Sequence, residues 1–341
     1  MATPRWRSAS RWRSGSNRSP MTSRCRNGGP RRPDSFNSRE RDMATAKTKF
    51  GIQTYDYPPD QLLALAKAAD RLGFEGLWMG EHYVNPSSFQ SAHPGHTERS
   101  EVTEDDILGP HVTLYDPIAF LCAVAGATQH LKIGTAIVIV PLMHPLLLAR
   151  ATVTAWHVSG GRFRLGTGAG WLKEEFDILG VPFNERGSRL DEAIDIMQKA
   201  WAGGYFEHSG KHFQFECSQQ VTKDPTPIPL VIGGNTGPAL RRVARVADMW
   251  MNSAMISLEE ALRLRDTIEA ERRALGKNEP LSYILRPESP DVETVGSFLA
   301  EGFDHIVLWG PHLWPKGGPL SIAEKEAKLA AFAAEMGITP R

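Results

Sequence analysis

Short apolar runs alternate with longer amphipathic stretches from Lys49 to the end of the chain. The first run, KFGIQT, is typical of a buried strand. In the stretch after it, one helical stripe ends at Gly73 and carries Leu62, Leu65, Ala66, Ala69 and Leu72. Eight strands are predicted in this way, at 49–54, 75–82, 132–140, 162–170, 227–235, 248–253, 281–287 and 305–310. Because helices separate successive strands, we expect the strands to be parallel.

The same alternation also fits an open, doubly wound sheet, which is the structural alternative. That fold usually carries a G-x-G-x-x-G loop after its first strand, and GIQTYDYPP has none. Eight uninterrupted units favour the α/β class with a closed (β/α)8 TIM barrel. Two insertions are expected: a polar stretch at 83–114 after strand 2, and a small hairpin at 205–216 before strand 5. Loops as long as the first are often functional.

The first 42 residues differ from the rest in composition. They hold eleven arginines and no lysine against three acidic residues, and they lack Leu, Ile and Val. Such a segment cannot bury enough apolar surface to offset its ordering entropy. It superficially suits a nucleic-acid tail or a transit peptide, but it has no apolar face. We expect a disordered extension over 1–42 and a catalytic domain over 43–341. Because Met43 opens a natural-looking N-terminus, a mis-assigned start is favoured as the origin of the extension.

Composition excludes several classes of protein. Charged residues and prolines break every apolar run before the ~18 residues of a membrane span, so a soluble protein without membrane or nucleic-acid partners is expected. Cys25, Cys122 and Cys217 are too far apart for a disulfide framework or a metal motif, which fits the reducing cytoplasm. The HPGH segment at 93–96 lacks partnering acids, so no metal is expected. No Ser or Cys nucleophile elbow is present.

In a barrel, the active site lies at the carboxyl ends of the strands, and three strand exits carry candidate chemistry. GGNTGP (233–238) joins glycines to a helix start, which favours phosphate binding over a plain capped turn. GTGAGW (166–171) is also glycine-rich, but taken alone it favours a tight turn over a binding loop. Glu81 and His82 end strand 2, where an imidazole can move a proton or serve only a structural purpose.

Four longer segments together resemble the bacterial luciferase-like monooxygenase superfamily, and in particular its subgroup that uses the deazaflavin coenzyme F420. They are GLWMGEHY, IGTAIVIVPLMHPLLLA, GGRFRLGTGAGWLKEEFDILGVPFNERGSRLDEAI and VIGGNTGPALRRVARVADMW. The resemblance implies a homodimeric barrel oxidoreductase that transfers a hydride between F420 and a small organic substrate. A separate reductase can supply the reduced cofactor in such systems.

The resemblance also implies roles for individual residues. His82 would lie beside the reacting ring atoms. Glu81, next to it at the end of the strand, is predicted from that position as a second catalytic residue. Ala136 and Ile137 would form a bulge behind the ring, where the family commonly has a non-proline cis peptide. The cofactor tail and its phosphate would be bound by Gly168, Gly170, Gly233, Gly234, Asn235 and Thr236.

Trp171 departs from the family's pattern. It replaces the acidic proton donor of F420-dependent glucose-6-phosphate dehydrogenases, so that activity is not expected. Glu174 and Glu175 lie on the following turn and need not take over its role. Three alternatives stay open: an FMN-dependent monooxygenase, a non-catalytic flavin- or deazaflavin-binding barrel, and a sugar-phosphate isomerase or lyase.

Overall fold

The computed structural model describes residues 48–54, 58–92, 108–215, 217–314 and 320–341. The expected extension at 1–42, its boundary at Met43 and the middle of the insertion after strand 2 therefore lie outside the described residues. So do His93 and His96 of the HPGH segment.

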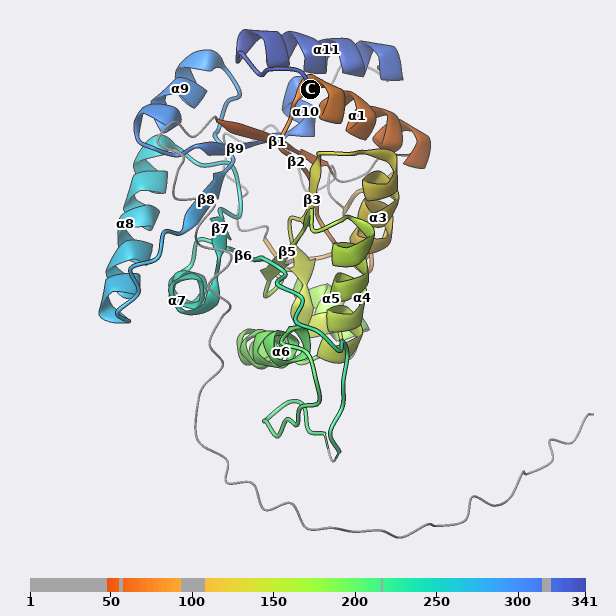
Figure 1. The fold of residues 1–341 in the computed structure, drawn as a ribbon, viewed down its shortest axis with the longest axis vertical. Coiled ribbons are helices and arrows are strands. Elements are labelled where there is room, and N and C mark those ends of the chain that lie inside the picture. Colours follow the sequence, from red (N-terminus) through yellow and green to blue (C-terminus); the bar gives the residue numbers. More distant parts are fainter. Residues whose placement is uncertain (1–47, 55–57, 93–107, 216, 315–319) are drawn as a thin grey trace, which may run out of the picture. The chain divides into compact units, whose positions relative to one another are not determined.

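The strands form one ring of parallel neighbours (Figure 1). Their bounds are β1 (Lys49–Thr54), β2 (Gly76–Met79), β3 (Lys132–Thr135), β4 (Val138–Ile139), β5 (Phe163–Gly168), β6 (Leu230–Gly233), β7 (Met249–Met251), β8 (Ser282–Leu285) and β9 (His305–Trp309). β1 pairs with both β2 and β9, and the ring closes where Ile133 of β3 lies opposite Phe163 of β5. This closure confirms the barrel and excludes the open sheet.

The predicted strand at 132–140 is interrupted, which is a correction to the sequence-based prediction. β3 pairs with β2 and the start of β5, whereas β4 pairs with the end of β5. Between them lies a cis peptide bond joining Ala136 to Ile137. β3 and β4 together take one place in the ring, so the nine strand labels correspond to eight positions in the barrel.

Helices connect the strands and surround them (Figure 1). The longer ones are α1 (Pro59–Leu72), α3 (Pro117–Ala127), α4 (Pro145–Val158), α6 (Arg186–Trp201), α7 (Gly237–Val246), α8 (Leu258–Ala274), α9 (Val292–Ala300) and α11 (Ile322–Glu335). Short helical turns are η2 (Val140–Leu142), α5 (Lys173–Ile178), η3 (Phe183–Glu185) and α10 (Gly310–Leu313). α1 ends at Gly73 as predicted, because that residue adopts φ 90°.

The barrel interior is filled by one large side chain and a few aliphatic ones. Trp78 of β2 packs with Val231, Met251, Ile284 and Val307 from other strands. Glycine at position 134 makes room for it, because a Cβ there would lie 2.3 Å from the indole ring. A second, larger apolar layer lies between the outer face of the strands and the helices. The interior is therefore a packed core, and ligands must bind at its ends.

The insertion before β6 forms the expected hairpin only in part. Two isolated antiparallel bridges, Phe206 with Gln219 and Ser209 with Gln214, replace a continuous ladder. Glu192 of α6 holds its tip, because the carboxylate lies 3.0 Å from Nε2 of His208 and accepts the backbone amides of residues 212 and 213. Side-chain contacts to α6 thus fix a segment that has little sheet of its own.

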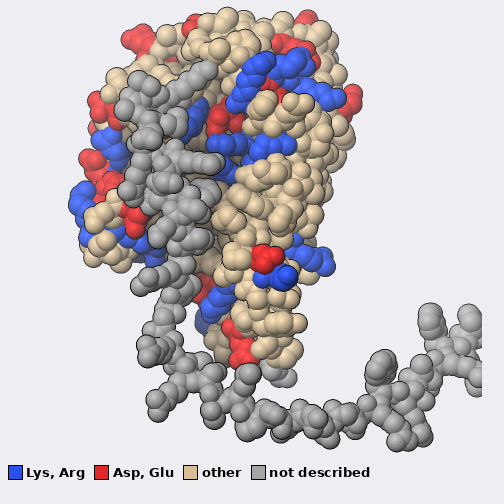
Figure 2. Space-filling view, in the orientation of Figure 1, with Lys and Arg blue, Asp and Glu red and all other residues tan. Residues whose placement is uncertain are grey.

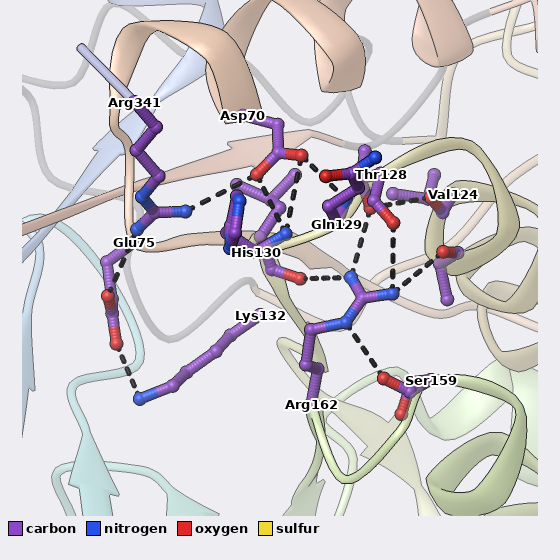
Figure 3. Close-up of polar contacts among 12 residues, drawn as sticks. Asp70, Glu75, Val124, Thr128, Gln129, His130, Lys132, Ser159, Arg162 and Arg341 are labelled. Carbon is purple, nitrogen blue, oxygen red and sulfur yellow. Dashed lines mark hydrogen bonds and ion pairs between the residues drawn. The ribbon is translucent and has the colours of Figure 1, made fainter.

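The amino-terminal end of the barrel is held by a polar network (Figure 3). Arg162 donates to the carbonyls of Ala125, Thr128, Leu131 and Ser159 at 2.7–3.1 Å. Asp70 accepts the backbone amides of residues 129 and 130 and a hydrogen bond from Arg341. A hollow of about 730 Å³ lies beside this network. The hollow lies at the end opposite the strand exits, and the Arg162 guanidinium already donates to backbone carbonyls. We therefore infer that this end of the barrel contributes to stability and not to chemistry.

Basic and acidic side chains are interspersed on the face that Figure 2 shows. No helix within the described ranges is both long and apolar enough to cross a bilayer.

Candidate active site

The site is built around His82, which follows β2 at the carboxyl end of the barrel. Its side chain is 6% exposed, and Nδ1 lies 3.1 Å from Oε2 of Glu175, which is wholly buried. When Nδ1 donates its proton to this carboxylate, the neutral imidazole carries its lone pair on Nε2. The pair therefore fixes both the orientation and the tautomer of the ring, as a general acid or base requires.

Glu175 reaches His82 because the exit of β5 turns directly into α5. Its neighbour Phe176 is also fully buried, so this side of the short helix faces the protein. The other carboxylate oxygen of Glu175 accepts the backbone amides of Tyr83 and Val84. One carboxylate thus holds the imidazole and the chain immediately after it.

Glu174, the preceding residue, fixes the next part of the same loop. Its carboxylate accepts the Gln90 amide at 2.7 Å and the Ser91 hydroxyl at 2.7 Å. Within the described residues, the insertion after β2 therefore starts as a segment fastened to α5. Adjacent carboxylates have separate tasks: Glu175 orients the imidazole, and Glu174 anchors the loop.

Trp171 forms an aromatic wall beside the imidazole. Its ring centroid lies 5.6 Å from that of His82 with an interplanar angle of 87°, and the Phe89 ring also packs edge-on against the indole, at 6.1 Å. An indole supplies apolar surface and no titratable proton. Trp171 therefore limits the access of solvent to His82, and it cannot itself act as a proton donor.

Glu81 has a different environment from His82. Burial raises the pKa of its carboxyl to about 8, and the hydrogen bond from the backbone amide of Ile139, at 2.8 Å, opposes this shift. Burial also raises the pKa of the nearby Tyr83 hydroxyl, whose oxygen has no hydrogen bond of good geometry among the described residues. Glu81 thus joins the exit of β2 to β4, directly after the cis peptide. Its structural contact is with the backbone of β4.

The Ala136–Ile137 bulge has the cis peptide that the resemblance implied. The side chain of Ile137 lies across glycines of the next two strands. A Cβ at Gly168 would lie 2.6 Å from its Cδ1 atom, and one at Gly233 would lie 2.9 Å from its Cγ2 atom. These glycines were expected to allow a ligand close to the backbone. The structure gives a further reason for them, because they form the groove in which Ile137 packs.

The predicted phosphate cradle follows β6. Gly234 adopts φ 124°, and Asn235 accepts the backbone amide of Ser253 through Oδ1 at 3.0 Å. Thr236 precedes α7 and is exposed, and within the described residues no side chain caps this helix. The start of α7, at the positive end of the helix dipole, thus has no side-chain cap from the described residues. The geometry is open to an anion, and phosphate binding stays a prediction.

The structure thus brings most predicted site residues to one rim. Glu81, His82, the Ala136–Ile137 bulge and the tips of β5 and β6 are adjacent through the contacts described above. Gly170, with φ 84°, lies in the loop after β5. The two histidines of the HPGH segment lie outside the described residues. Within those residues, no group of three or more metal-ligating side chains is present.

Three residues of this rim are not evident from the sequence. In the sequence, Glu175 is only an acid on the turn after Trp171, and its contact with His82 gives no signal because the two residues are 93 positions apart. Gln53 is a buried polar residue of β1, and its Nε2 donates to the carbonyl of Ala136 at 3.2 Å. Arg286 directly follows β8, and its Nη1 donates to Oε1 of Gln53 at 2.8 Å. A cation at a strand exit is the one signal that could have revealed this last residue.

Comparison with known proteins places this geometry in a family. The profile described as luciferase-like monooxygenase matches residues 40–286. An uncharacterized protein of Mycobacterium tuberculosis is 30% identical over 247 residues, which are 72% of this chain and 83% of that protein. A second uncharacterized protein of the same species is 30% identical over 271 residues, or 78% of this chain and 93% of that protein.

Solved structures share the fold at low sequence identity. A monooxygenase from Streptomyces bottropensis aligns with a TM-score of 0.61 at 18% identity, over 84% of this chain and 98% of its own. The coenzyme F420-dependent tetrahydromethanopterin reductase of Methanopyrus kandleri gives 0.56 at 18% identity, over 87% and 84%. The FMN-bound oxygenating constituent of 3,6-diketocamphane monooxygenase from Pseudomonas putida gives 0.55 at 18% identity, over 70% and 66%. Identities this low show the fold alone.

Proposed function

This chain belongs to the luciferase-like monooxygenase family, and on that premise we propose that it is an oxidoreductase that transfers a hydride between coenzyme F420 and a small organic substrate. The observation that carries the proposal is the His82–Glu175 pair at the mouth of the barrel. An imidazole with a fixed tautomer, buried beside an aromatic wall, is suited to moving one proton during redox chemistry.

The residues at the mouth fit a flat ring with a phosphate-bearing tail. Ile137 fills the groove over Gly168 and Gly233, so the bulge presents a continuous apolar support. The uncapped start of α7 offers an amide to an anion. Bound here, the deazaflavin supplies the hydride chemistry itself. The ring and its tail would be held by Ala136, Ile137, Gly168 and Gly170. The phosphate would be contacted by Gly233, Gly234, Asn235 and Thr236.

The chain's own contribution is then positioning and proton transfer. His82 holds or delivers the proton at Nε2, while Glu175 keeps the ring aligned through Nδ1. Trp171 and Phe89 exclude water from one side of the imidazole. Glu81 holds β4, the strand that follows the bulge, through the Ile139 amide, and we propose that it affects turnover through this contact.

Titration of the purified protein with F420 and with FMN tests the cofactor assignment. We expect a lower dissociation constant for F420, because the segments around GWLKEEF and ERGSRLDEAI resemble the F420-using subgroup. Tight binding of FMN without a response to F420 would contradict the assignment and favour a flavin-dependent monooxygenase. Binding of either cofactor with no turnover of any candidate substrate would favour a non-catalytic barrel.

We also propose that the protein is a cytoplasmic homodimer that receives reduced cofactor from a separate reductase. These features are supported by the resemblance and by the cysteine pattern. Sedimentation of the purified protein measures the oligomeric state directly, and a monomer at micromolar concentration would contradict the homodimer.

A further inference from the structure

A cation with no counter-ion among the described residues lies at the mouth of the barrel. It follows β8, which is separated from β2 and its His82 by β1 and β9. Arg286 directly follows β8, and its guanidinium donates to Oε1 of Gln53 at 2.8 Å and to the carbonyl of Asn252. Both acceptors are neutral. Within the described ranges, its buried Nε also has no hydrogen-bond partner.

The Arg286 guanidinium is held in place by contacts with Asn252 and Gln53. The backbone amide of Arg286 donates to Oδ1 of Asn252 at 2.9 Å, and Asn252 is only 1% exposed. Gln53 connects the guanidinium to the bulge, because its Nε2 donates to the carbonyl of Ala136. Desolvation lowers the pKa of Arg286 to about 10, so the side chain is still a cation at neutral pH. A charge with such fixed neutral partners is preorganised for an anion.

A second donor extends from the neighbouring strand. Alternation along β8 and β9 puts Arg286 on the side of Ile284, and Trp309 on the side of Val307, both of which belong to the interior cluster. The indole Nε1 of Trp309 is buried and has no hydrogen-bond partner in the part of the chain that the structure describes. The interior rim of β8 and β9 thus carries two kinds of donor, and its described contacts include no acidic side chain.

We propose that Arg286, assisted by the Trp309 indole, binds an anionic oxygen of the molecule held at the barrel mouth. This inference rests on the proposed function for the identity of that molecule. The expected source is a carboxylate or phosphate group of the organic substrate, which would make the enzyme selective for acidic substrates. The other source of the same chemistry is the negatively charged edge of the reduced ring.

Acetate and inorganic phosphate are the probes, titrated calorimetrically at constant ionic strength into cofactor-free and cofactor-loaded protein. Arg286→Met should weaken probe binding by about tenfold to a hundredfold, the loss expected for a charge-assisted hydrogen bond. Arg286→Lys should recover part of it. Arg263→Met is the matched control, because that arginine is exposed on α8 and paired with Glu260. Its affinity for the probes should equal that of the wild type.

Gln53→Glu is a second variant that leaves the arginine in place. It puts a carboxylate where Oε1 now lies 2.8 Å from the guanidinium, so the cation gains an internal partner. Probe binding should fall as it does in Arg286→Met. Because the substitution is isosteric, it tests the charge even if Arg286→Met does not fold.

The midpoint potential of the bound ring distinguishes the two sources. Loss of probe binding in Arg286→Met at an unchanged potential assigns the site to the substrate's acid group. A more negative potential assigns it to the reduced ring, because the variant no longer stabilises that anion. If the wild type and Arg286→Met agree in both measurements, the proposal is overturned. If neither cofactor binds, the proposed function fails, while the titration of the cofactor-free protein still decides the role of Arg286.

Discussion

Oε2 of Glu175 lies 3.1 Å from Nδ1 of His82, and the two side chains are almost completely shielded from solvent. The contact joins the exits of two barrel strands that are not neighbours, since β2 and β5 are separated by β3. It fixes the orientation of the His82 imidazole at the mouth of the barrel.

Replacing His82 with alanine should lower kcat by about a hundredfold or more, the usual contribution of a positioned acid or base. The dissociation constant for the cofactor should change little, because the ring's support comes from other residues. His157→Ala is the control, since that histidine is exposed at the end of α4. Steady-state kinetics and cofactor titration measure both effects. An unchanged kcat in His82→Ala would remove its catalytic role.

Glu175→Gln keeps the shape of the side chain but loses the carboxylate opposite Nδ1. We expect a lower kcat, because an amide can both donate and accept and no longer fixes one tautomer of the imidazole. Glu174→Gln is the control in the same turn, and it should loosen the loop at Gln90 and Ser91 while His82 keeps its orientation. An unchanged kcat in Glu175→Gln would show that the contact is only structural.

The buried carboxyl of Glu81 should make stability depend on pH. Its pKa is about 8 in the folded protein, against 4.5 for a glutamate carboxyl exposed to water. Between these values the folded state binds more protons than the unfolded state, so the free energy of unfolding falls as pH rises. The limit for one proton is about 1.4 kcal/mol per pH unit. Denaturant unfolding from pH 5 to pH 9 measures it.

Glu81→Gln is neutral throughout this range and can still accept from the Ile139 amide. The part of the pH dependence due to Glu81 should therefore disappear in the variant. An identical dependence in both proteins would mean that another group is responsible.

Gly168→Ala should lower stability and weaken cofactor binding. The added Cβ would lie 2.6 Å from Cδ1 of Ile137, and overpacking of this kind costs about 1 to 3 kcal/mol. Adding Ile137→Val removes Cδ1, so the double variant should regain part of the loss. Gly126→Ala in α3 is the control, because nothing lies within 4 Å of its added Cβ, and it should be neutral or slightly stabilising. Additive effects in the double-mutant cycle would show that the two residues do not interact.

Arg162→Met at the opposite end of the barrel should affect stability and not chemistry. It removes hydrogen bonds to four backbone carbonyls, and we expect a loss of about 3 kcal/mol in the free energy of unfolding. Turnover at a temperature where the variant is folded should match the wild type. Arg273→Met, on the exposed face of α8, is the control for stability. A selective loss of kcat in Arg162→Met would mean that the hollow at this end takes part in function.

The order of strands and helices can be read from the sequence, because burial imposes a period on each segment separately. The same reading places His82 and the GGNTGP turn at strand exits, since parallel strands in a barrel share one carboxyl end. It also predicts eight positions in the ring. The Ala136–Ile137 bulge lies inside a predicted strand, and only the resemblance to the family implies it. The error over 132–140 is local: the segment is apolar and rich in β-branched residues, and periodicity carries no information about a break in pairing.

The side chains that meet at that rim are known only from the folded barrel. Glu175 and His82 are 93 positions apart, and Arg286 and Gln53 are 233 apart. Contacts of this kind depend on how far each strand is staggered against its neighbour and on which loop turns inward, and neither quantity has a period in the sequence. The same holds for Ile137, whose side chain explains Gly168 and Gly233 only after closure of the barrel brings three strands together.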